Sequence, residues 1–521
     1  MRLVVSAVQM AEMDRQTIHE IGVPGVVLME NAGLGVVAEI KNILGRLAGK
    51  RILIFCGKGN NGGDGYVVAR NLHNAGARPE VYLIGNKSAV KGDALINLEI
   101  VMRMGLDVKE IQVEKELDIP PGADLIVDAI FGTGIVGAVE GLAAKVIDFI
   151  NQFGTPVVAI DLPSGLETDT GLVHGPCVRA TATVTMAHLK RGLLLPPGRD
   201  YAGKVSVVDI GIPPEVSQRQ EVKTYLVEDA DIAPMLPRRP RDAHKNTCGK
   251  VFILAGSLGM TGAATLTSTS VLRAGAGLAI LGIPESLNPI LEEKVTEVIT
   301  RPLPEGNPGC VGWTAQSVIS ELLEWADVVA LGPGLRTHSE TVELVHWIVQ
   351  SVQDKPMVID ADGLNALSQK PELIKSSRTE MVLTPHAGEL SRLIKKPTKE
   401  ILDNRIEIVR EVAAEWQKVL VLKGSPTIIG DKDGSVFLNP TGNAGMATGG
   451  SGDVLTGAIA GLLAQGASPR DAAITGVYLH GLAGDLARAK FGEMGLIAGD
   501  ILEELPMAIK RFENPAEPHD A

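Results

Sequence analysis

The residues that could do chemistry gather in two glycine-rich segments, one in each half of the 521-residue chain. The C-terminal segment, Asn443–Asp453, has the sequence NAGMATGGSGD and leads directly into an apolar stretch that predicts a helix. Small residues expose backbone N–H groups and a helix start adds its dipole, so this segment can bind an anion such as a phosphoryl group in transfer. A helix cap alone would explain Asp453, but it would not require Gly445, Gly449, Gly450 and Gly452.

The N-terminal segment, Gly57–Leu72, follows an apolar run and opens a helical pattern over Tyr66–Ala75. Its sequence, GKGNNGGDGYVVARNL, contains a GxGxxG match, which alone is a weak signal. The acidic residue that usually closes the next strand of a dinucleotide site is absent, because that strand ends at Gly85. The pattern therefore disfavours an ordinary Rossmann dehydrogenase and favours a phosphate or dinucleotide loop of another kind.

Several other classes of chemistry are excluded. There is no P-loop and no HExxH motif, and Ser451 lacks the final glycine of a nucleophile elbow. The net charge of −13 argues against nucleic acid or an anionic membrane as a partner. We find no signal peptide and no membrane-spanning run, and the four isolated cysteines suit reduced thiols. We therefore expect a cytoplasmic protein with no membrane partner and no nucleic-acid partner.

Short apolar runs alternate with helical patterns in both halves, which is typical of parallel sheets covered on both faces. In the first half, the runs are 51–57, 80–85, 124–132, 156–165, 182–187 and 205–213. In the second half, they are 250–257, 278–284, 327–334, 356–363, 381–386, 419–425 and 427–431. The fold class predicted is α/β, with two three-layer domains. A proline-rich, charged stretch predicts a linker at 216–245 between domains at 1–215 and 246–512, followed by a disordered tail at 513–521.

The C-terminal half resembles the ribokinase-like superfamily, in which a GxGD loop lies at a helix start. Further motifs in order are HKNTCGKV (244–251), GSLGMTGAATL (256–266), LGPGL (331–335), IDADGLN (359–365), LTPHAGEL (383–390) and VLKGSPTII (421–429). Together they resemble the ADP/ATP-dependent NAD(P)H-hydrate dehydratases over about Val227–Phe512, with Asn246 standing where a glycine is expected.

That resemblance implies a ribokinase-like sheet, with Asp453 as the catalytic base, and a magnesium ion (Mg²⁺) at the site. The residues implied to bind the adenine nucleotide are Lys423, Gly424, Ser425, Pro426, Thr427, Asn443, Ala444, Gly445, Met446, Ala447, Thr448, Gly449, Gly450, Ser451 and Gly452. Those implied to face the hydrated nicotinamide are Ala263, Gly334, His386, Ala387, Gly388, Glu389, Leu390, Ser391, Arg392 and Asp453. Outside that context His386 would be an ordinary strand-end histidine and Lys423 a solvated charge. Asp360 and Asp362 are either polar strand-end residues or groups that position the nucleotide and Mg²⁺.

The implied chemistry is physically sensible. The hydroxyl of a hydrated, reduced nicotinamide ring is a poor leaving group, and phosphorylation makes it a good one. The ring nitrogen then expels phosphate and restores the double bond. Asp453 would take the hydroxyl proton as the glycine-rich loop stabilises the moving phosphoryl group.

The N-terminal half carries MENAG (29–33), VDAIFGTGIVG (127–137) and AIDLPSGL (159–166). With NNGGDG, these resemble the NAD(P)H-hydrate epimerase domain over about Met1–Glu215, a Rossmann-like fold. The residues implied to hold the hydrate are Asn60, Asn61, Gly62, Gly63, Asp64, Gly132, Thr133, Gly134, Ile135, Val136, Gly137, Ala138 and Asp161. Asn61, Asp128 and Ser164 are implied to bind a potassium ion (K⁺), which suits oxygen ligands of low charge. Asp161 is our candidate acid/base group, although Asp128 and Asp161 could instead serve turns at strand ends.

Together the two resemblances predict a bifunctional isomerase and lyase that repairs NADHX and NADPHX, the hydrates of NADH and NADPH. One domain would interconvert the R and S forms, and the other would dehydrate the S form with ADP as co-substrate, leaving ATP possible. We also expect a homo-oligomer, a tetramer or larger. The alternatives are a ribokinase-like small-molecule kinase with an N-terminal NAD-derivative-binding module, or an N-terminal half that acts only as a sensor or assembly module.

Overall fold

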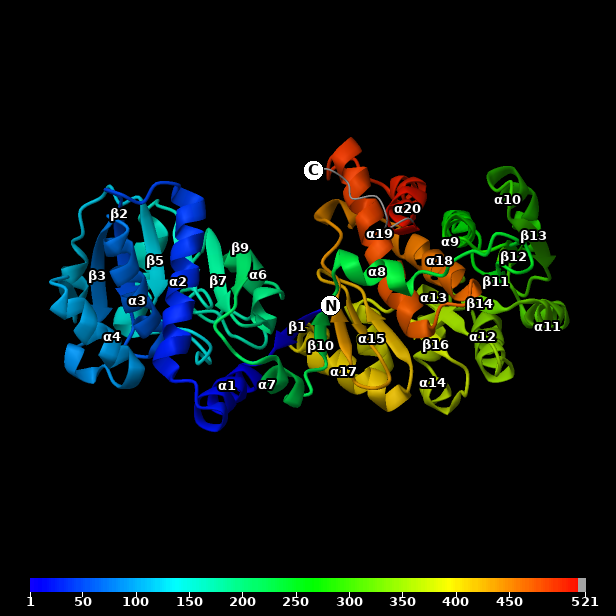
Figure 1. Cartoon of the computed structure of the whole chain (residues 1–521). Coiled ribbons are helices and arrows are strands. Elements are labelled where there is room, and N and C mark those ends of the chain that lie inside the picture. The colour runs from blue at the N-terminus through cyan, green and yellow to red at the C-terminus, as the bar shows by residue number, and fades with distance from the viewer. Residues whose placement is uncertain (514–521) are drawn as a thin grey trace. The chain divides into compact units, whose positions relative to one another are not determined.

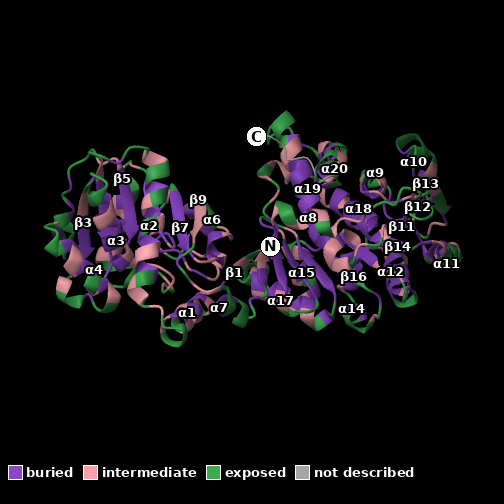
Figure 2. Cartoon of the chain, viewed as in Figure 1, coloured by how far each residue is buried: buried purple, intermediate pink, exposed green. Residues whose placement is uncertain are grey.

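The computed structural model describes residues 1–513 and divides into two compact units. One consists of Arg2–Val222, and the other of Met1 with the chain from Lys223 onward. Each unit is built on a sheet whose strands are buried beneath helices (Figure 1; Figure 2). The α/β fold class expected for both halves is confirmed.

The N-terminal unit contains a seven-stranded sheet in the order β4-β3-β2-β5-β6-β7-β9, and every neighbouring pair is parallel. The bounds are β2 Arg51–Cys56, β3 Arg78–Ile84, β4 Val108–Ile111, β5 Leu125–Ala129, β6 Val157–Ile160, β7 Ala182–Met186 and β9 Lys204–Val208. The order reverses between β2 and β5, as in Rossmann-like sheets. Ligands of such sheets bind in the crevice at that reversal, beyond the carboxyl ends of the strands.

Helices cover both faces of this sheet because its central strands alternate between two apolar surfaces. Ile52 and Ile54 of β2 join the core formed with α2, α3 and α4, whereas Leu53 and Phe55 join the core formed with α5. The helices are α1 Ala7–Gln16, α2 Gly25–Leu44, α3 Asn60–Asn74, α4 Gly92–Arg103, α5 Gly141–Gln152, α6 Gly198–Ala202 and α7 Pro214–Arg219. Two short strands, β1 Arg2–Val5 and β8 Leu189–Lys190, pair with each other in parallel.

The C-terminal unit has its strands in the order β13-β12-β11-β14-β15-β16-β17-β18-β19-β10. They are parallel from β13 to β17, and β18 is antiparallel to both of its neighbours. The bounds are β10 Thr224–Leu226, β11 Lys250–Leu254, β12 Leu278–Pro284, β13 Ile299–Leu303, β14 Val328–Leu331, β15 Met357–Ile359, β16 Met381–Leu383, β17 Val419–Leu422, β18 Ile428–Gly430 and β19 Val436–Leu438.

One apolar core on this sheet is formed with α9, α18, α19 and α20. The helices of this unit are α8 Asp229–Met235, α9 Thr261–Arg273, α10 Asn288–Lys294, α11 Gln316–Trp325, α12 Ser339–Ser351, α13 Ala361–Leu367, α14 Glu372–Ser376, α15 Ala387–Ile394, α16 Thr398–Asp403, α17 Arg405–Trp416, α18 Ser451–Ala464, α19 Pro469–Phe491 and α20 Ala498–Glu513. Every residue of α18 from Val454 to Leu463 is buried, so this helix is fixed by packing along most of its length.

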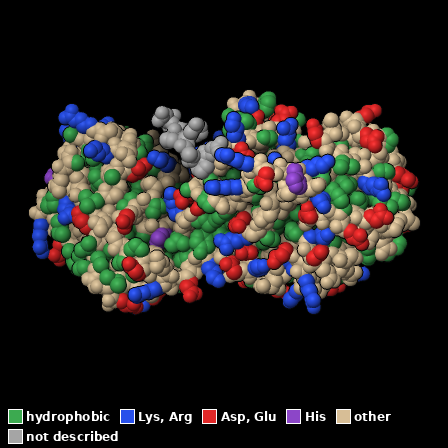
Figure 3. All heavy atoms as spheres, turned by 45° about the vertical axis from the view of Figure 1, so that its right-hand side comes forward, with side chains coloured by type: hydrophobic (Ala, Val, Ile, Leu, Met, Phe, Trp, Pro, Cys, Tyr) green, Lys and Arg blue, Asp and Glu red, His purple; other side chains and the backbone are tan. Residues whose placement is uncertain are grey.

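The segment expected as a linker at 216–245 is largely ordered, because it contains most of α7 together with β10 and α8. Prolines are compatible with these helices: Pro234 lies within α8, and Pro214, just before the segment, stands in the first turn of α7, where its missing N–H costs nothing. The expected tail falls mostly outside the described residues. Within residues 1–513, no helix is both long and apolar enough to cross a bilayer. Figure 3 shows basic and acidic side chains interspersed on the face in view.

Candidate active sites

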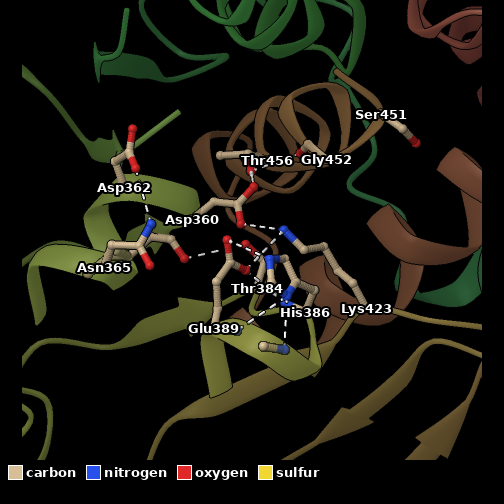
Figure 4. A network of polar contacts seen from close by, with 12 residues as sticks. Asp360, Asp362, Asn365, Thr384, His386, Glu389, Lys423, Ser451, Gly452 and Thr456 are labelled. Atoms are coloured by element: carbon tan, nitrogen blue, oxygen red, sulfur yellow. Dashed lines mark hydrogen bonds and ion pairs between the residues drawn. The ribbon is translucent and has the colours of Figure 1, made fainter. Parts of the chain in front are cut away.

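The C-terminal site forms where the parallel strands end. Asp360 follows β15, His386 lies just after β16 and Lys423 follows β17, while α18 presents its N-terminus to the same place (Figure 4). The carboxyl ends of adjacent parallel strands meet at one edge of a sheet, and that is why residues so distant in sequence come together.

A buried ion pair lies at the centre of this site. The Nζ atom of Lys423 donates to Oδ1 of Asp360 at 2.5 Å and lies 3.8 Å from Glu389. The second oxygen of Asp360 accepts from the Thr456 hydroxyl at 2.9 Å. Burial alone would lower the pKa of Lys423, but the charges of Asp360 and Glu389 hold it above its ordinary value. Lys423 is therefore a fixed cation, and Asp360 is a positioning carboxylate rather than a free metal ligand.

Asp453, in the first turn of α18, is the one carboxyl here with the properties of a base near neutral pH. Burial raises the pKa of Asp453 to about 6, the charge of Asp360 adds to that shift, and the Lys423 ammonium opposes it. A carboxylate with this pKa is ionised at pH 7 and still basic enough to accept a proton from a hydroxyl that is losing it.

The glycine-rich loop needs its glycines for two different reasons. Gly450 caps α18 with φ +94°, in the left-handed region where a side chain is strained. At Gly452, an added Cβ would lie 3.3 Å from Nζ of Lys423 and 3.4 Å from Oδ2 of Asp360. The absence of a side chain there lets the loop backbone approach the ion pair, so amides and ammonium can serve one anion.

Hydrogen bonds to α19 also hold the glycine-rich loop in place. Asn443 accepts from the Gly445 amide at 3.0 Å and donates to Asp485 of α19 at 2.9 Å. His480, also on α19 and only 8% exposed, has its Nε2 atom 2.9 Å from the Ser451 carbonyl oxygen. Burial lowers the pKa of His480 to about 4, so its ring is neutral at physiological pH and donates to that carbonyl.

The TPHAGEL motif forms the start of α15. His386 is its N-cap: its Nδ1 accepts from the Gly388 and Glu389 amides at 3.0 and 3.2 Å, and Glu389 accepts from the His386 amide at 2.8 Å. Its Nε2 lies 3.4 Å from Oε1 of Glu389, and its side chain is about half exposed. Its capping role is therefore real, and one ring nitrogen still lies at the site.

The remaining residues predicted for this site differ in their surroundings. Gly334 lies beside Ala263, since an added Cβ on Gly334 would come within 3.1 Å of the alanine Cβ. Arg392 donates to Asn365 at 3.0 Å, next to Asp362. Leu390, in contrast, is fully buried and belongs to the core of α15 rather than to a ligand surface. Asp362 accepts from the Arg336 amide at 2.7 Å, which is a turn role.

The N-terminal site is a cavity of about 510 Å³ at the switch point between β2 and β5. Of the residues expected to hold the hydrate, the cavity is lined by Asn60, Asn61, Asp64, Gly132, Thr133, Gly134 and Asp161. Gly62 and Gly63 are buried in the first turn of α3, and Val136 is exposed at 85% and is not part of the lining.

Asp161 is held in an unusual conformation on the cavity wall. Its φ is +67°, and its Oδ1 accepts from Lys190 at 2.5 Å, from Thr185 at 3.0 Å and from the Met186 amide at 3.2 Å. Lys190 is completely buried. A strained backbone kept in place by this many contacts is typical of a functional residue, and it argues against the simple turn role.

Of the three residues expected to bind K⁺, Asp128 and Ser164 are buried at and beyond the end of β5, and Asn61 lies in the first turn of α3. Asp128 accepts from the Ser164 hydroxyl at 2.6 Å and from its amide at 2.8 Å. Burial raises the pKa of Asp128 to about 6, although these hydrogen bonds lower it. Both amide atoms of the Asn61 side chain are buried without a hydrogen-bond partner in residues 1–513. A buried carbonyl oxygen without a hydrogen-bond partner is energetically costly unless an ion or a ligand binds to it.

Sequence reasoning did not find four residues of these sites. Lys190 and Asp14 reach the N-terminal cavity from β8 and α1, and neither belongs to a recognisable motif. Thr456 lies one turn beyond Asp453, a spacing that places it on the same helix face, so it could have been proposed. His480 comes from the next helix and gave no signal beyond being a histidine in an apolar stretch.

Fold and geometry thus define an α/β enzyme with two sites, one with a buried base beside an anion-binding helix start and one with an acidic cavity. Residues 251–507 match the family model described as NAD(P)H-hydrate dehydratase, and residues 25–192 match that of the YjeF-related protein N-terminus. The bifunctional NAD(P)H-hydrate repair enzyme Nnr of Moorella thermoacetica is 47% identical over 98% of both chains. That of Thermofilum pendens is 39% identical over 97% of this chain and 96% of its own.

The chain belongs to the family of bifunctional NAD(P)H-hydrate repair enzymes, which confirms both expected resemblances. Among solved structures, the ADP/ATP-dependent NAD(P)H-hydrate dehydratase of Bacillus subtilis, co-crystallized with ATP/Mg²⁺, is 32% identical, with a TM-score of 0.49 over 56% of this chain and 99% of that one. A ribokinase-like superfamily protein of Enterococcus faecalis is 27% identical, with a TM-score of 0.49 over 56% and 98%.

Proposed function

We propose that the N-terminal unit interconverts the R and S hydrates of NADH and NADPH, and that the C-terminal unit dehydrates the S form at the expense of ADP, giving AMP and phosphate. The observation that carries the second activity is the position of Asp453, a base with a raised pKa, at the start of α18 beside the Lys423–Asp360 pair. The family membership supports the pairing of the two activities in one chain.

In the dehydratase, Asp453 would take the proton of the hydrate hydroxyl as its oxygen attacks the terminal phosphoryl group. The amides of Gly449–Gly452 and the Lys423 ammonium would stabilise charge on the phosphoryl group in transfer. Asp360 and Thr456 hold that ammonium in place, and His480 holds the loop. The remaining loop residues and Gly424–Thr427 would bind the adenine nucleotide, with ATP as an alternative donor.

The donors at this site suit Mg²⁺ that arrives with a nucleotide. No group of three or more His, Cys, Asp or Glu residues within residues 1–513 is arranged to hold a metal ion. Mg²⁺ usually binds through one or two carboxylates together with phosphate oxygens, and the Asp453 carboxylate lies beside Gly450 of the loop. Bound there, Mg²⁺ would neutralise phosphate charge.

The donors near β5 also suit K⁺. The side-chain oxygen of Asn61 has no partner among the described residues, and Asp128 with Ser164 adds one buried negative charge and a hydroxyl. K⁺ bound by these groups would fix the loops around the cavity. We expect epimerase activity to fall when K⁺ is replaced by tetramethylammonium, and equal activity in both salts would contradict the site.

We also propose that the enzyme is cytoplasmic and a homo-oligomer, a tetramer or larger. Light scattering coupled to size-exclusion chromatography would measure its mass in solution. A single species with the mass of one chain, 54.9 kDa, would contradict the proposed assembly.

The decisive experiment supplies a mixture of R and S NADHX with ADP or with ATP and follows NADH absorbance and phosphate release. We expect complete conversion of the mixture, because epimerisation feeds the S-specific dehydratase. Conversion of only the S fraction would leave the epimerase unsupported. No NADH with either nucleotide would overturn the dehydratase, and a stable phosphorylated product would identify a simple kinase instead.

A further inference from the structure

The carboxylates around the N-terminal cavity are not equivalent in their hydrogen bonds. Asp161 has three donors, and all of them reach Oδ1. Its Oδ2 is turned toward Gly132, 3.6 Å from where a Cβ would stand, and is left to meet a ligand. The Lys190 ammonium, 2.5 Å from Oδ1, makes a charge-assisted hydrogen bond that orients the Asp161 carboxyl and leaves Oδ2 beside Gly132.

Asp64 is the opposite case. It lies in the first turns of α3 and lines the same cavity, yet its carboxyl accepts no hydrogen bond from any residue within 1–513. Burial raises the pKa of Asp64 well above its ordinary value, and the charges of Asp161 and Asp14 raise it further, while Lys190 opposes them. The pKa of Asp64 is therefore shifted toward the protonated acid, which is the form that can donate a proton.

The charges that face Asp64 come from several elements. Asp161 follows β6, Asp14 lies on α1 and Lys190 on β8, and the Cys56 thiol ends β2. Burial raises the pKa of Asp14 to about 6 as well. Lys58 and Asp93 complete the charged lining. A carboxylate paired with an ammonium, beside an unpaired carboxyl whose pKa is raised by burial, is a recurrent arrangement for acid–base catalysis.

We propose that Asp64 is the general acid and base of epimerisation, and that Asp161, locked by Lys190, binds the hydrate and stabilises positive charge on its ring. This inference rests on the proposed epimerase function and divides between two residues a role that the sequence suggested for Asp161 alone.

Asp64 gives its proton to the hydroxyl on the ring carbon next to the ring nitrogen, and the C–O bond breaks to release water. The nitrogen lone pair forms a C=N bond, so the ring becomes a cation that the Asp161 carboxylate stabilises. Water then adds to the opposite face of that carbon, the C=N electrons return to nitrogen, and the proton of the added water returns to Asp64. The product is the other epimer, and no oxidant or reductant is consumed.

The test is Asp64→Asn in the full chain, which keeps the shape and neutrality of the side chain but removes its proton. With a pure R hydrate and chromatographic separation of the epimers, we expect the epimerase kcat to fall about 10²–10⁴-fold with KM nearly unchanged. Asp107→Asn, which removes an exposed carboxyl of the same unit that does not line the cavity, serves as the matched control and should epimerise normally. ADP-dependent dehydration of the S hydrate should persist in both variants and reports that each chain is folded.

A pH profile separates chemistry from structure. An acid must be protonated to act, so wild-type epimerase kcat should fall on the alkaline side, and Asp64→Glu should keep that fall while Asp64→Asn loses it. Asp161→Asn should chiefly raise KM. Epimerisation by Asp64→Asn at the wild-type rate would overturn this inference and leave the proposed function standing, whereas a wild-type chain that cannot epimerise at all would overturn the proposed function itself.

Discussion

The Nζ atom of Lys423 and Oδ1 of Asp360 lie 2.5 Å apart at the edge of the C-terminal sheet. The Asp360 carboxylate is 1% exposed and the Lys423 side chain 20% exposed. The Nζ atom lies 3.3 Å from where a Cβ on Gly452 would stand, so the cationic end of the pair faces the glycine-rich loop. The consequence is a positive charge that cannot swing away from the phosphate it is proposed to bind. Several predictions about the dehydratase depend on this arrangement and on the helix start beside it.

Lys423→Met should leave Asp360 buried without its counter-charge. We expect the free energy of unfolding to fall by about 2–4 kcal/mol, which is less than for a fully buried pair because Lys423 is partly exposed. We also expect a large rise in the KM for ADP. The double variant Lys423→Met/Asp360→Asn should recover part of the stability and none of the activity. Chemical denaturation and NADH formation measure the two effects, and equal stability of the single variant and wild type would contradict the prediction.

Asp453→Asn should lower dehydratase kcat by about 10²–10⁴-fold because the hydroxyl proton loses its acceptor. Epimerase activity in the same chain should be unaffected and serves as the control. A fall smaller than about threefold, with S hydrate and ADP at saturation, would remove Asp453 from the role of base.

The pH dependence of the dehydratase has a definite sign. Because burial raises the pKa of Asp453 to about 6, the base is lost as pH falls through that value. We expect kcat to rise from pH 5 to pH 7 with a midpoint near 6 and then to level off. A profile that is flat across this range, or that falls with pH, would show that another group accepts the proton.

The sites at the strand ends could be predicted from the sequence, because apolar runs that end in Gly, Asp or Pro indicate where the strands of a parallel sheet end. Strand β13 could not be predicted, because its residues are mostly exposed and include Thr300, Arg301 and Pro302. This pattern is typical of an edge strand and not of a core strand. The helices in and next to the expected linker were hidden by prolines that in fact stand in them: Pro234 lies within α8, and Pro214, just before the linker, starts α7.

The sites themselves show the same limit. Residues in contiguous motifs, such as Asp453 and Asp161, could be proposed from spacing. Lys190, Asp14 and His480 could not, because they reach the sites from elements far away in the chain and only the packing of those elements reveals them. Leu390 lies within a ligand motif, and helical periodicity places its side chain in the core.

His480→Leu should weaken the loop without altering the base. It removes the donor 2.9 Å from the Ser451 carbonyl, and the loss of that hydrogen bond costs about 1 kcal/mol. We expect the KM for ADP to rise about tenfold with a smaller change in kcat, and His480→Gln to restore part of the affinity. In the wild type, burial keeps the pKa of His480 at about 4, so its NMR signals should not titrate between pH 6 and 8. Titration in that range would contradict the assigned neutral ring.

Gly450→Ala should damage only the C-terminal unit. The residue has φ +94°, and a Cβ there would lie 2.6 Å from Leu266 and 3.1 Å from Ala498. We expect a loss of about 1–3 kcal/mol and little dehydratase activity, with epimerase activity retained. Gly466→Ala, also at positive φ (+92°) but facing open space, is the matched control for strain without crowding. Equal losses in the two variants would show that crowding at Gly450 contributes nothing.

The burial of α18 from Val454 to Leu463 determines how rigid the glycine-rich loop is during catalysis. A loop joined to a helix that the core holds on all sides cannot rearrange by local opening, so its amides are oriented before the nucleotide arrives and need no reorganisation as charge moves. The same rigidity has a kinetic side. Amide hydrogens of α18 should exchange with solvent only through large-scale unfolding of this unit, on a timescale far slower than turnover.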